Sequence, residues 1–280
     1  MRFKLFITLS LVAVFALGSL SFADGTEEEL TQKFLSRYEK THVQKLSFIT
    51  VHTNFNRINR NNDYNDFANY ESNNFNSGNL SWLNDPLSFG MDFGVILSER
   101  YAWSFGFDVW SGMGEQLSGS YFYAPSGTTI ENPQSDISLW GIQTGVQYYF
   151  YNKPEQSGEL KSLALRSGVT VGYYQVKWDL WQEYSNLNLA TATSEAENST
   201  FEDSGPSIEL GLGADYPLNL WGLNLGVDFS YLYLNFDQVG WYNSQDEEVV
   251  ASFTGNEEGR VDLDFSGFRG KVEFKRFFSL

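Results

Sequence analysis

The sequence predicts an all-β chain: an eight-stranded antiparallel up-and-down transmembrane β-barrel, preceded by a short N-terminal helix. Three observations carry this prediction. Large apolar residues alternate with small or polar ones over segments long enough to be strands. Eight such segments are joined by connections that are alternately long and short. Aromatic residues make up 17% of the chain although its mean hydropathy is −0.32, so the rings do not belong to long apolar runs.

Residues 1–23 have the pattern of a secretory signal peptide. Cations at Arg2 and Lys4 precede an apolar stretch, and small residues lead to a cleavage position before Asp24. The alternative, a transmembrane anchor, is disfavoured because the apolar stretch is short. No other segment approaches the run of about 20 apolar residues that a membrane-spanning helix needs. The sequence therefore indicates an exported chain.

The eight strand-like segments make up the predicted barrel domain, residues 45–280. They lie near 45–57, 86–98, 101–114, 136–151, 161–182, 206–216, 220–237 and 260–280. The alternation of connections is typical of a barrel with turns on one rim and loops on the other. The long connections are 58–85, 115–135, 183–205 and 238–259. Because the number of strands is even, both ends of the barrel are expected on the short-turn rim.

The stretch LSFGMDFGVILSERYAWSFGFDVW, residues 87–110, indicates which face of the barrel points outward. Outside a tight hairpin at 97–100, alternate positions are large and apolar, and most of the others are Gly, Ser or Asp. Rings from every strand would overfill an eight-stranded barrel, whereas small residues leave room for a few long charged side chains. The apolar face is therefore predicted to contact lipid. Representative lipid-facing residues are Phe89, Phe93, Trp103, Phe105, Trp140 and Leu225.

Two departures from regular alternation lie near the loop rim. In segment 161–182 the apolar parity changes after Tyr173, so a bulge is predicted near Tyr173–Gln175. A similar slip is predicted near Ser266–Gly267. Aromatic residues near strand ends, such as Tyr101 at the turn rim and Trp178 at the loop rim, are expected to form interfacial girdles.

Nine ionisable residues have inward parity and form the candidate site. They are His52, Asp92, Asp108, Arg166, Glu209, Asp228, Lys271, Glu273 and Lys275. Unpaired charge in a confined lumen is costly, so these side chains are predicted to form a hydrogen-bonded ion network. The interior of an eight-stranded barrel is just wide enough for side chains, which favours a closed lumen. The alternative is a narrow, gated ion path lined by the same carboxylates.

Composition and motifs argue against several classes of function. Without its signal peptide the chain has a net charge of −19 and no cysteine, which disfavours nucleic-acid binding and excludes thiol chemistry. A Ser-His-acid hydrolase would use His52, but that residue has inward parity and no G-x-S-x-G elbow is present. Glycosidase chemistry by Asp92 and Asp108 is not expected, because a filled lumen admits no sugar. The sequence predicts no enzyme activity and no cofactor.

The last strand adds a possible assembly signal. The chain ends RGKVEFKRFFSL, with apolar residues on one parity from Phe268 to Leu280. Together with the signal peptide and the eight strands, residues 45–280 resemble the small bacterial outer-membrane barrels of the outer membrane protein A, X and W type. Two features differ: that family usually ends in an aromatic residue rather than Leu280, and Arg276 interrupts the apolar parity. The resemblance implies a monomer in the outer membrane of a Gram-negative-type bacterium, with outer-membrane lipid and the barrel assembly machinery as partners.

Residues 24–44 are expected to form a short periplasmic helix before the barrel. Thr26, followed by acidic residues, fits a helix cap, and Leu30, Phe34 and Tyr38 recur at the i, i+4 spacing. A frayed tail is the alternative.

The four long loops hold −15 of the mature net charge of −19. The simplest interpretation is a solvated, repulsive surface coat. The alternative is that the carboxylates gather divalent cations, which prefer oxygen ligands and would bridge the loops to lipopolysaccharide or to other surface ligands. The metal candidates are Asp246, Glu247, Glu248, Glu257 and Glu258.

These expectations combine into one predicted function. The chain is expected to be a non-enzymatic integral outer-membrane barrel with acidic extracellular loops and a structural or surface-interaction role. The alternative is a narrow pore or a small-solute transporter of the outer membrane.

Overall fold

In a computed structural model of the chain, the described residues are 46–59, 63–66, 69, 83, 85–98, 100–113, 120–123, 128–154, 160–186, 194–218, 222–239, 241–243, 248–249 and 261–279. The chain divides into Met1–Gln44 and Lys45–Leu280, and all described residues belong to the second unit. The predicted signal peptide and the predicted helix within 24–44 lie outside them. No helix in the described part is long and apolar enough to cross a membrane.

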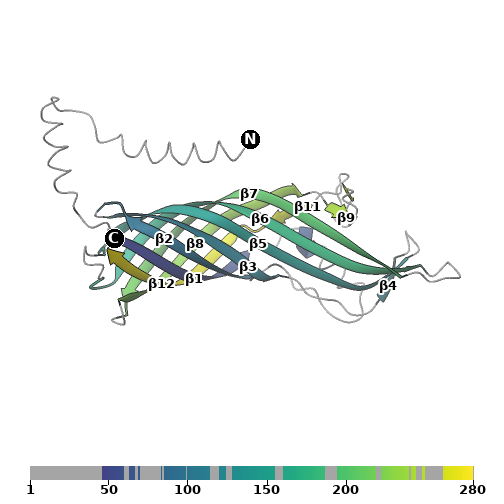
Figure 1. The fold of residues 1–280 in the computed structure, drawn as a ribbon, viewed down its shortest axis with the longest axis horizontal. Helices are drawn as coiled ribbons and strands as arrows, with labels where there is room; N and C mark the ends of the chain where they lie inside the picture. The colour runs from purple at the N-terminus through teal and green to yellow at the C-terminus, as the bar shows by residue number, and fades with distance from the viewer. Residues whose placement is uncertain are drawn as a thin grey trace, which may run out of the picture. The chain divides into compact units, whose positions relative to one another are not determined.

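Eight long strands form a closed antiparallel barrel (Figure 1). They are β1 (Leu46–Ile58), β2 (Leu87–Ile96), β3 (Tyr101–Met113), β5 (Thr128–Tyr151), β6 (Ala164–Asn186), β7 (Ser194–Pro217), β8 (Leu223–Val239) and β12 (Gly267–Ser279). Each pairs with the next along the chain, and β1 closes the barrel by pairing with β12. The predicted eight-stranded up-and-down barrel is confirmed.

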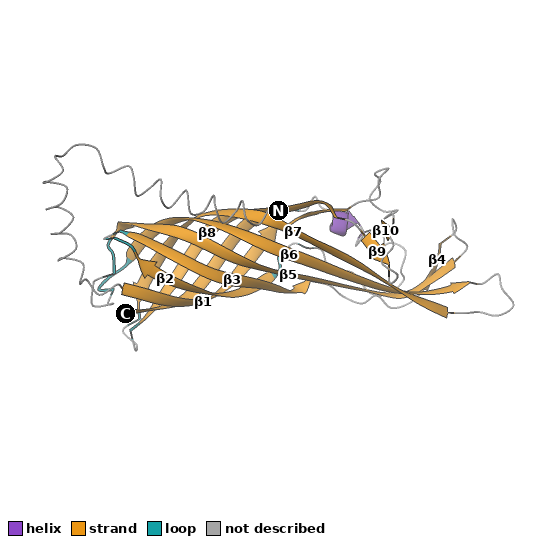
Figure 2. Ribbon diagram, turned by 45° about the horizontal axis from the view of Figure 1, so that its top comes forward, coloured by secondary structure: helices purple, strands orange, loops and turns teal. Residues whose placement is uncertain are grey.

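Four short strands accompany the barrel near its loop rim. β4 (Ser120–Tyr123) pairs with β5, β9 (Trp241–Asn243) pairs with β7, and β10 (Glu248–Val249) pairs with β9. β11 (Val261–Asp264) pairs with β8 and leads into β12. A helical turn at 63–66 lies at the same end of the barrel (Figure 2).

Three strands are longer than the alternation of apolar residues predicts. β5 begins at Thr128 rather than near 136, β6 continues to Asn186, and β7 begins at Ser194 rather than near 206. Parts of the predicted loops 115–135 and 183–205 are therefore strand. The residues 128–138, 175–186 and 194–206, here called the extension, run beyond the other long strands (Figures 1 and 2).

The turns on the opposite rim are short. In the hairpin at 97–100, the backbone N–H groups of Leu97 and Ser98 both donate to the Tyr101 carbonyl, at 2.8 and 3.3 Å. After β5, Asn152 has a φ of 49°, a left-handed conformation in which its side-chain amide donates to the Leu163 carbonyl at 2.7 Å. These bonds fix the strand pairing on both sides of each turn.

The predicted bulge near Tyr173–Gln175 is wrong. Tyr173, Tyr174 and Gln175 pair in unbroken register with both β5 and β7. The predicted slip at Ser266–Gly267 is not a slip of register either: the strand is interrupted there, but Asp264 pairs with Asn235 and Gly267 with Leu232, in the same register. In both places the apolar residues move from the outer face of the wall to the inner face without a shift of register.

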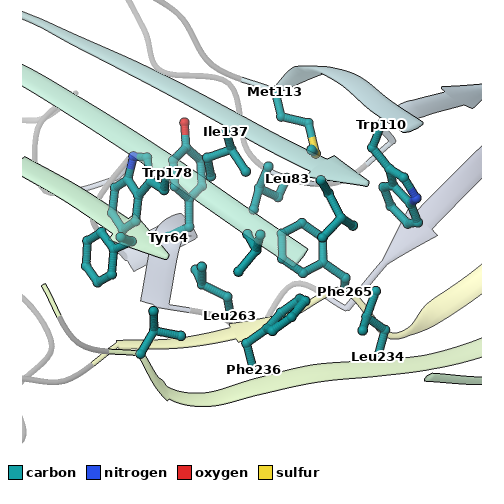
Figure 3. Packing of buried hydrophobic residues seen from close by; sticks show 14 of the residues in the cluster. Tyr64, Leu83, Trp110, Met113, Ile137, Trp178, Leu234, Phe236, Leu263 and Phe265 are labelled. Atoms are coloured by element: carbon teal, nitrogen blue, oxygen red, sulfur yellow. The ribbon is translucent and has the colours of Figure 1, made fainter. Parts of the chain in front are cut away.

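This change of face creates a buried apolar cluster, the upper apolar core, inside the loop-rim end of the barrel (Figure 3). Trp178, predicted as a girdle residue, lies in this core, fully buried and stacked on Phe201 with 4.7 Å between ring centroids. The core consists of Ile58, Tyr64, Leu83, Trp110, Met113, Ile137, Leu139, Tyr174, Val176, Trp178, Leu180, Phe201, Leu232, Leu234, Phe236, Val239, Val261, Leu263 and Phe265.

Candidate functional site

The candidate site is the polar layer of the lumen below the upper apolar core. All nine ionisable residues predicted from inward parity lie on the inner wall. Eight are buried and Lys271 is half-buried. They reach the lumen because successive side chains of a strand point to opposite faces, so alternate residues of each strand line the interior.

Arg166 is the centre of one ion cluster, the Arg166 cluster. Its guanidinium lies 3.1 Å from Asp215 Oδ1 and 3.0 Å from Asp228 Oδ2, and it also pairs with Glu273. Lys275 Nζ closes the cluster at 3.1 Å from Asp215 Oδ2 and 3.0 Å from Glu273 Oε1. These charges are therefore matched at close range by neighbouring groups of opposite sign, as charges removed from water must be.

Arg269 is the centre of a second cluster, the Arg269 cluster. Its guanidinium lies 2.5 Å from Asp108 Oδ2 and 2.9 Å from Glu209 Oε2. It also donates through Nε to Asn56 Oδ1 at 2.7 Å and through Nη2 to Ser88 Oγ at 3.1 Å. Arg269 is 2% exposed, so its planar fork is almost completely enclosed by acceptors.

Asp108 links the Arg269 cluster to the upper apolar core. Its Oδ2 accepts from Trp110 Nε1 at 3.0 Å and from Tyr174 Oη at 3.3 Å. Both rings belong to the core, and the Arg269 guanidinium lies 5.3 Å from the Trp110 ring centroid. The polar layer and the core above it are thus joined through shared side chains.

His52 lies between carboxylates from two neighbouring strands. Its Nδ1 is 3.2 Å from Asp92 Oδ2, and its Nε2 is 3.9 Å from Asp108 Oδ1. Asp92 Oδ1 accepts in addition from Gln143 Nε2 at 3.1 Å. The His52 side chain has no exposed surface, so it is a packed part of the inner wall.

Lys271 differs from the other lumen cations. Among the described residues it is the one cation of the polar layer without an ion pair, although its cross-strand neighbours are Asn54 and Asp228. The polar layer holds six carboxylates, namely Asp92, Asp108, Glu209, Asp215, Asp228 and Glu273. It holds four cations, namely Arg166, Arg269, Lys271 and Lys275, so negative charge is in excess.

Two charged members of these clusters are not among the nine predicted residues. Asp215 and Arg269 both follow the inward parity of their strands. Their neighbours in the chain, Tyr216 and Phe268, point outward. The parity rule applied to every residue of 206–216 and 260–280 would have found both. Their roles as bridging groups, in contrast, follow only from contacts between strands far apart in sequence.

Small residues opposite the charges make room for the clusters. A Cβ added at Gly213 would collide with Asp228 Oδ1 and stand 3.1 Å from Arg166 Cζ, and one at Gly90 would collide with the His52 ring. Gly213 and Gly90 are therefore needed for close approach, because only a residue without a Cβ leaves that space.

The turn-rim end of the lumen is filled by a lower apolar cluster. Tyr149 lies at its border: it packs in this cluster and donates its hydroxyl to Asp215 Oδ2 at 3.0 Å. The members are Leu46, Phe48, Ala102, Tyr149, Leu160, Ala164 and Phe277. The polar layer is thus bounded by apolar side chains toward both rims.

The outer wall carries the residues predicted to face lipid. Phe89, Phe93, Trp103, Phe105 and Trp140 point outward and are 37 to 53% exposed, and Leu225 is outward-facing and half-buried. Tyr101 is likewise exposed near the turn rim. These residues form part of a continuous outward-facing set of large apolar side chains, here called the apolar belt.

The metal candidates are not placed. Asp246, Glu247, Glu257 and Glu258 lie outside the described residues, and Glu248 belongs to β10 without a described side chain. The described part of the chain contains no group of three or more His, Cys, Asp or Glu side chains suited to a metal ion.

This chain is similar in fold to several solved structures of other proteins. No family model and no curated protein sequence matches the chain. Among solved structures, it is similar to the outer membrane protein OprG from Pseudomonas aeruginosa at 10% identity and a TM-score of 0.44, over 85% of this chain and 97% of that one. A major outer membrane protein from Thermus thermophilus is similar at 11% identity and a TM-score of 0.42, over 83% and 99%. Neisserial surface protein A is similar at 9% identity and a TM-score of 0.40, over 84% and 97%.

Proposed function

We propose that this chain is a non-enzymatic integral protein of the outer membrane, whose barrel spans the bilayer and whose extension and acidic loops act in surface contacts. The observation that carries the proposal is the apolar belt. Phe229 is 62% exposed, Phe93 is 53% exposed and Trp140 is 52% exposed, on three different strands of the barrel. A wall of exposed rings around a closed barrel is stable in hydrocarbon rather than in water.

The height of the belt fits a bilayer. Outward apolar positions run from Trp140 to Phe150 on β5 and from Ile208 to Tyr216 on β7, which are spans of eleven and nine residues. A tilted transmembrane strand needs about 9–11 residues. The belt therefore has the length that a single crossing requires.

The orientation follows from the two rims. The short turns and the beginning of β1 and end of β12 lie on one rim, and the extension lies on the other. In barrels of this type short turns face the periplasm and long loops face outward. The extension and the acidic loops are accordingly extracellular.

A structural role is favoured over a pore. Arg269, Asp108 and Lys275 are at most 2% exposed inside the polar layer, and apolar side chains fill the lumen on both sides of that layer. Ions crossing this interior would have to displace paired charges and packed rings. The excess of negative charge gives the pore alternative its best support, since it would favour cations.

The same enclosure argues against catalysis. His52 is paired with Asp92 and its side chain has no exposed surface, so no substrate reaches it in this conformation. The partners we propose are outer-membrane lipid at the belt, the barrel assembly machinery during insertion, and divalent cations or surface ligands at the acidic loops. We propose a monomer, because the belt requires lipid around the barrel.

Conductance tests the proposal. The mature chain, refolded in detergent and shown to be folded by heat-dependent migration on a gel, is inserted into a planar bilayer. We expect no discrete channels at neutral pH. Cation-selective channels that change with Asp92→Asn would contradict the structural role and support the pore. A chain that stays monomeric and folded in plain buffer would contradict the membrane assignment itself.

A further inference from the structure

The helical turn 63–66 covers the loop-rim end of the upper apolar core. Tyr64 is fully buried there, with its ring centroid 5.2 Å from that of Trp178. Figure 3 shows it beside Trp178, Ile137 and Leu83. The turn thus inserts one aromatic side chain into the top of the barrel.

The position of Tyr64 is specified by polar contacts as well as by packing. Ser135 Oγ donates to Tyr64 Oη at 3.3 Å and itself accepts from Trp178 Nε1 at 2.9 Å. Asn65 Oδ1 accepts from the Leu83 backbone N–H at 2.9 Å, which joins the two ends of the first long connection. Ser135 is 2% exposed, and the Tyr64 hydroxyl is one of the groups that contact it.

The turn is attached to the barrel differently from the strands. No backbone ladder joins 63–66 to a strand in the described part of the chain. It contacts β11 through a carboxylate: Asp63 Oδ2 accepts from the Asp262 backbone N–H at 2.8 Å. A short helical segment is not stable by itself, so the order of 63–66 depends on tertiary contacts, including the docking of the fully buried Tyr64.

Like charges oppose this docking. Asp63, Asp66 and Asp262 lie close enough for repulsion, and burial together with these neighbours raises the pKa of Asp63, while the N–H of Asp262 lowers it. Asp264, which accepts from Asn59 Nδ2 at 3.1 Å, adds a further carboxylate on β11. The turn is therefore held by the buried ring and by hydrogen bonds against the repulsion of neighbouring carboxylates. A segment attached in this way opens at a lower free energy than the strands of the barrel.

We propose that the turn 63–66 is a lid, and that withdrawal of Tyr64 opens the extracellular end of the barrel without unfolding it. This inference rests on the proposed function only for the orientation of the lid toward the outside. Opening exposes Ser135 and Trp178 first and then the core that leads to the Arg269 cluster. In the closed lid the Tyr64 ring is buried against Trp178.

Opening of the lid is measured by the rate at which a single cysteine introduced beneath it is labelled. The chain has no cysteine, so Ser135→Cys creates a unique site. The protein is placed in nanodiscs, and labelling by a water-soluble maleimide is followed by mass spectrometry. A second protein carries Ala102→Cys instead, at a buried position of the lower apolar cluster, and reports unfolding of the whole barrel.

We expect the thiol of Ser135→Cys to be labelled slowly and that of Ala102→Cys not at all over the same time. Adding Tyr64→Ala should accelerate labelling at position 135 by about ten- to a hundred-fold, because the buried ring that holds the lid is lost. Tyr64→Phe, which keeps the ring, should cause a much smaller change. The matched control is Asp66→Ala, at an exposed position of the same turn, which should not accelerate labelling.

Each other outcome contradicts the lid. Equal labelling at positions 135 and 102 means that exposure requires global unfolding. A thiol at position 135 that stays unlabelled unless the chain is denatured means that the turn is a static cap. Labelling that does not respond to Tyr64→Ala means that another segment covers position 135.

If Tyr64→Ala does not fold, Tyr64→Leu serves the same purpose. A chain that forms channels would contradict the proposed function but not the lid, and a chain that stays soluble would be labelled in buffer with the same variants.

Discussion

The part of the barrel inside the apolar belt and the extension beyond it share strands but have opposite polarity. On β6, Val169 points outward within the belt, and Arg166 lies inside. Farther along the same strand, Lys177 points outward and Trp178 lies inside. Between Arg166 and Trp178 the strand is paired with both neighbours in unbroken register. In the proposed membrane orientation, the change of face corresponds to a change of solvent, from hydrocarbon to water, around a continuous wall.

The other strands switch at the same level. On β8, Tyr233 is exposed and Asp237 follows as an exposed charge, while the inner face passes from Ser230 to Leu234. On β5, outward Trp140 gives way to Ser138. Hydrocarbon solvates apolar side chains on the outside, so polar side chains collect inside. Water reverses both preferences. In the proposed orientation, the level of the switch corresponds to the outer boundary of the membrane.

Removing Arg166, the central cation of its cluster, should cause the largest loss of stability. Arg166→Met leaves Asp215, Asp228 and Glu273 facing one another in a buried site with Lys275 as the remaining cation of the cluster. We expect a loss of about 3–5 kcal/mol in the free energy of unfolding. Urea titration of the detergent-refolded barrel measures it. A loss in the free energy of unfolding below about 0.5 kcal/mol, as for a surface substitution, would show that the barrel does not need the Arg166 cluster for its stability.

A cavity in the extension should be equally costly but confined to that part. Trp178→Ala removes the ring that stacks on Phe201 and contacts Tyr64, which costs about 3–5 kcal/mol in a packed core. Hydrogen exchange should show lost protection in 128–138 and 175–180, while heat-dependent migration of the barrel is kept. Loss of the folded band on the gel would mean that the two regions do not fold separately.

A charge on the outer wall distinguishes the two solvents directly. Phe229→Arg places a cation within the belt and should destabilise the barrel in lipid by about 2–4 kcal/mol. Gln134→Arg places the same side chain on the exposed outer face of the extension, where the change should stay within about 0.5 kcal/mol. Both are measured by unfolding in vesicles. Equal effects would contradict the proposed membrane boundary.

Two glycine substitutions test whether the Arg166 cluster needs a residue without a Cβ beside it. Gly213→Ala puts a methyl group against Asp228 and Arg166 and should cost about 1–3 kcal/mol by overpacking. Gly270→Ala is the control, since a Cβ there has no neighbour within 4 Å. The difference in the free energy of unfolding between the two variants, measured by urea titration, gives the cost of a methyl group on the inner face. Similar costs would show that general strand flexibility, rather than close approach, explains these glycines.

The smallest expected effect is a dependence of the lid on pH. Burial and the nearby Asp66 and Asp262 raise the pKa of Asp63 in the docked lid above its ordinary value of 3.8, and the N–H of Asp262 opposes this. Protonation of Asp63 therefore favours docking, so this stabilisation is complete below about pH 3.8 and is lost as the pH rises through the raised pKa. Protection of the Leu83 amide, corrected for intrinsic exchange, should fall over that interval.

The matched variant for the pH dependence is Asp63→Asn, which cannot titrate. It should flatten the dependence of Leu83 protection on pH, apart from the contributions of Asp66, Asp262 and Asp264. An unchanged pH dependence in this variant would assign the effect to those neighbours instead of Asp63.

The sequence by itself determined the strands within the belt and the face of each that points inward. Alternation is a local property, because neighbouring side chains of a strand leave on opposite sides regardless of the rest of the fold. Residues such as Phe93 and Asp92 could therefore be placed on the outer and inner walls from their order alone, and the eight-stranded barrel followed from the rhythm of turns.

The tertiary structure decided which charges meet and where the inside becomes apolar. Arg166 meets Glu273 although β7 and β8 lie between their strands, because the closed barrel curves the inner faces of these strands toward one another and sets their stagger, which no local pattern records. The apolar pattern places Trp178 outside only with a bulge after Tyr173, as if one solvent surrounded the whole strand. Alternation fixes that two faces differ, but the medium beyond the wall decides which face is apolar, and in the proposed orientation that medium changes with height above the membrane.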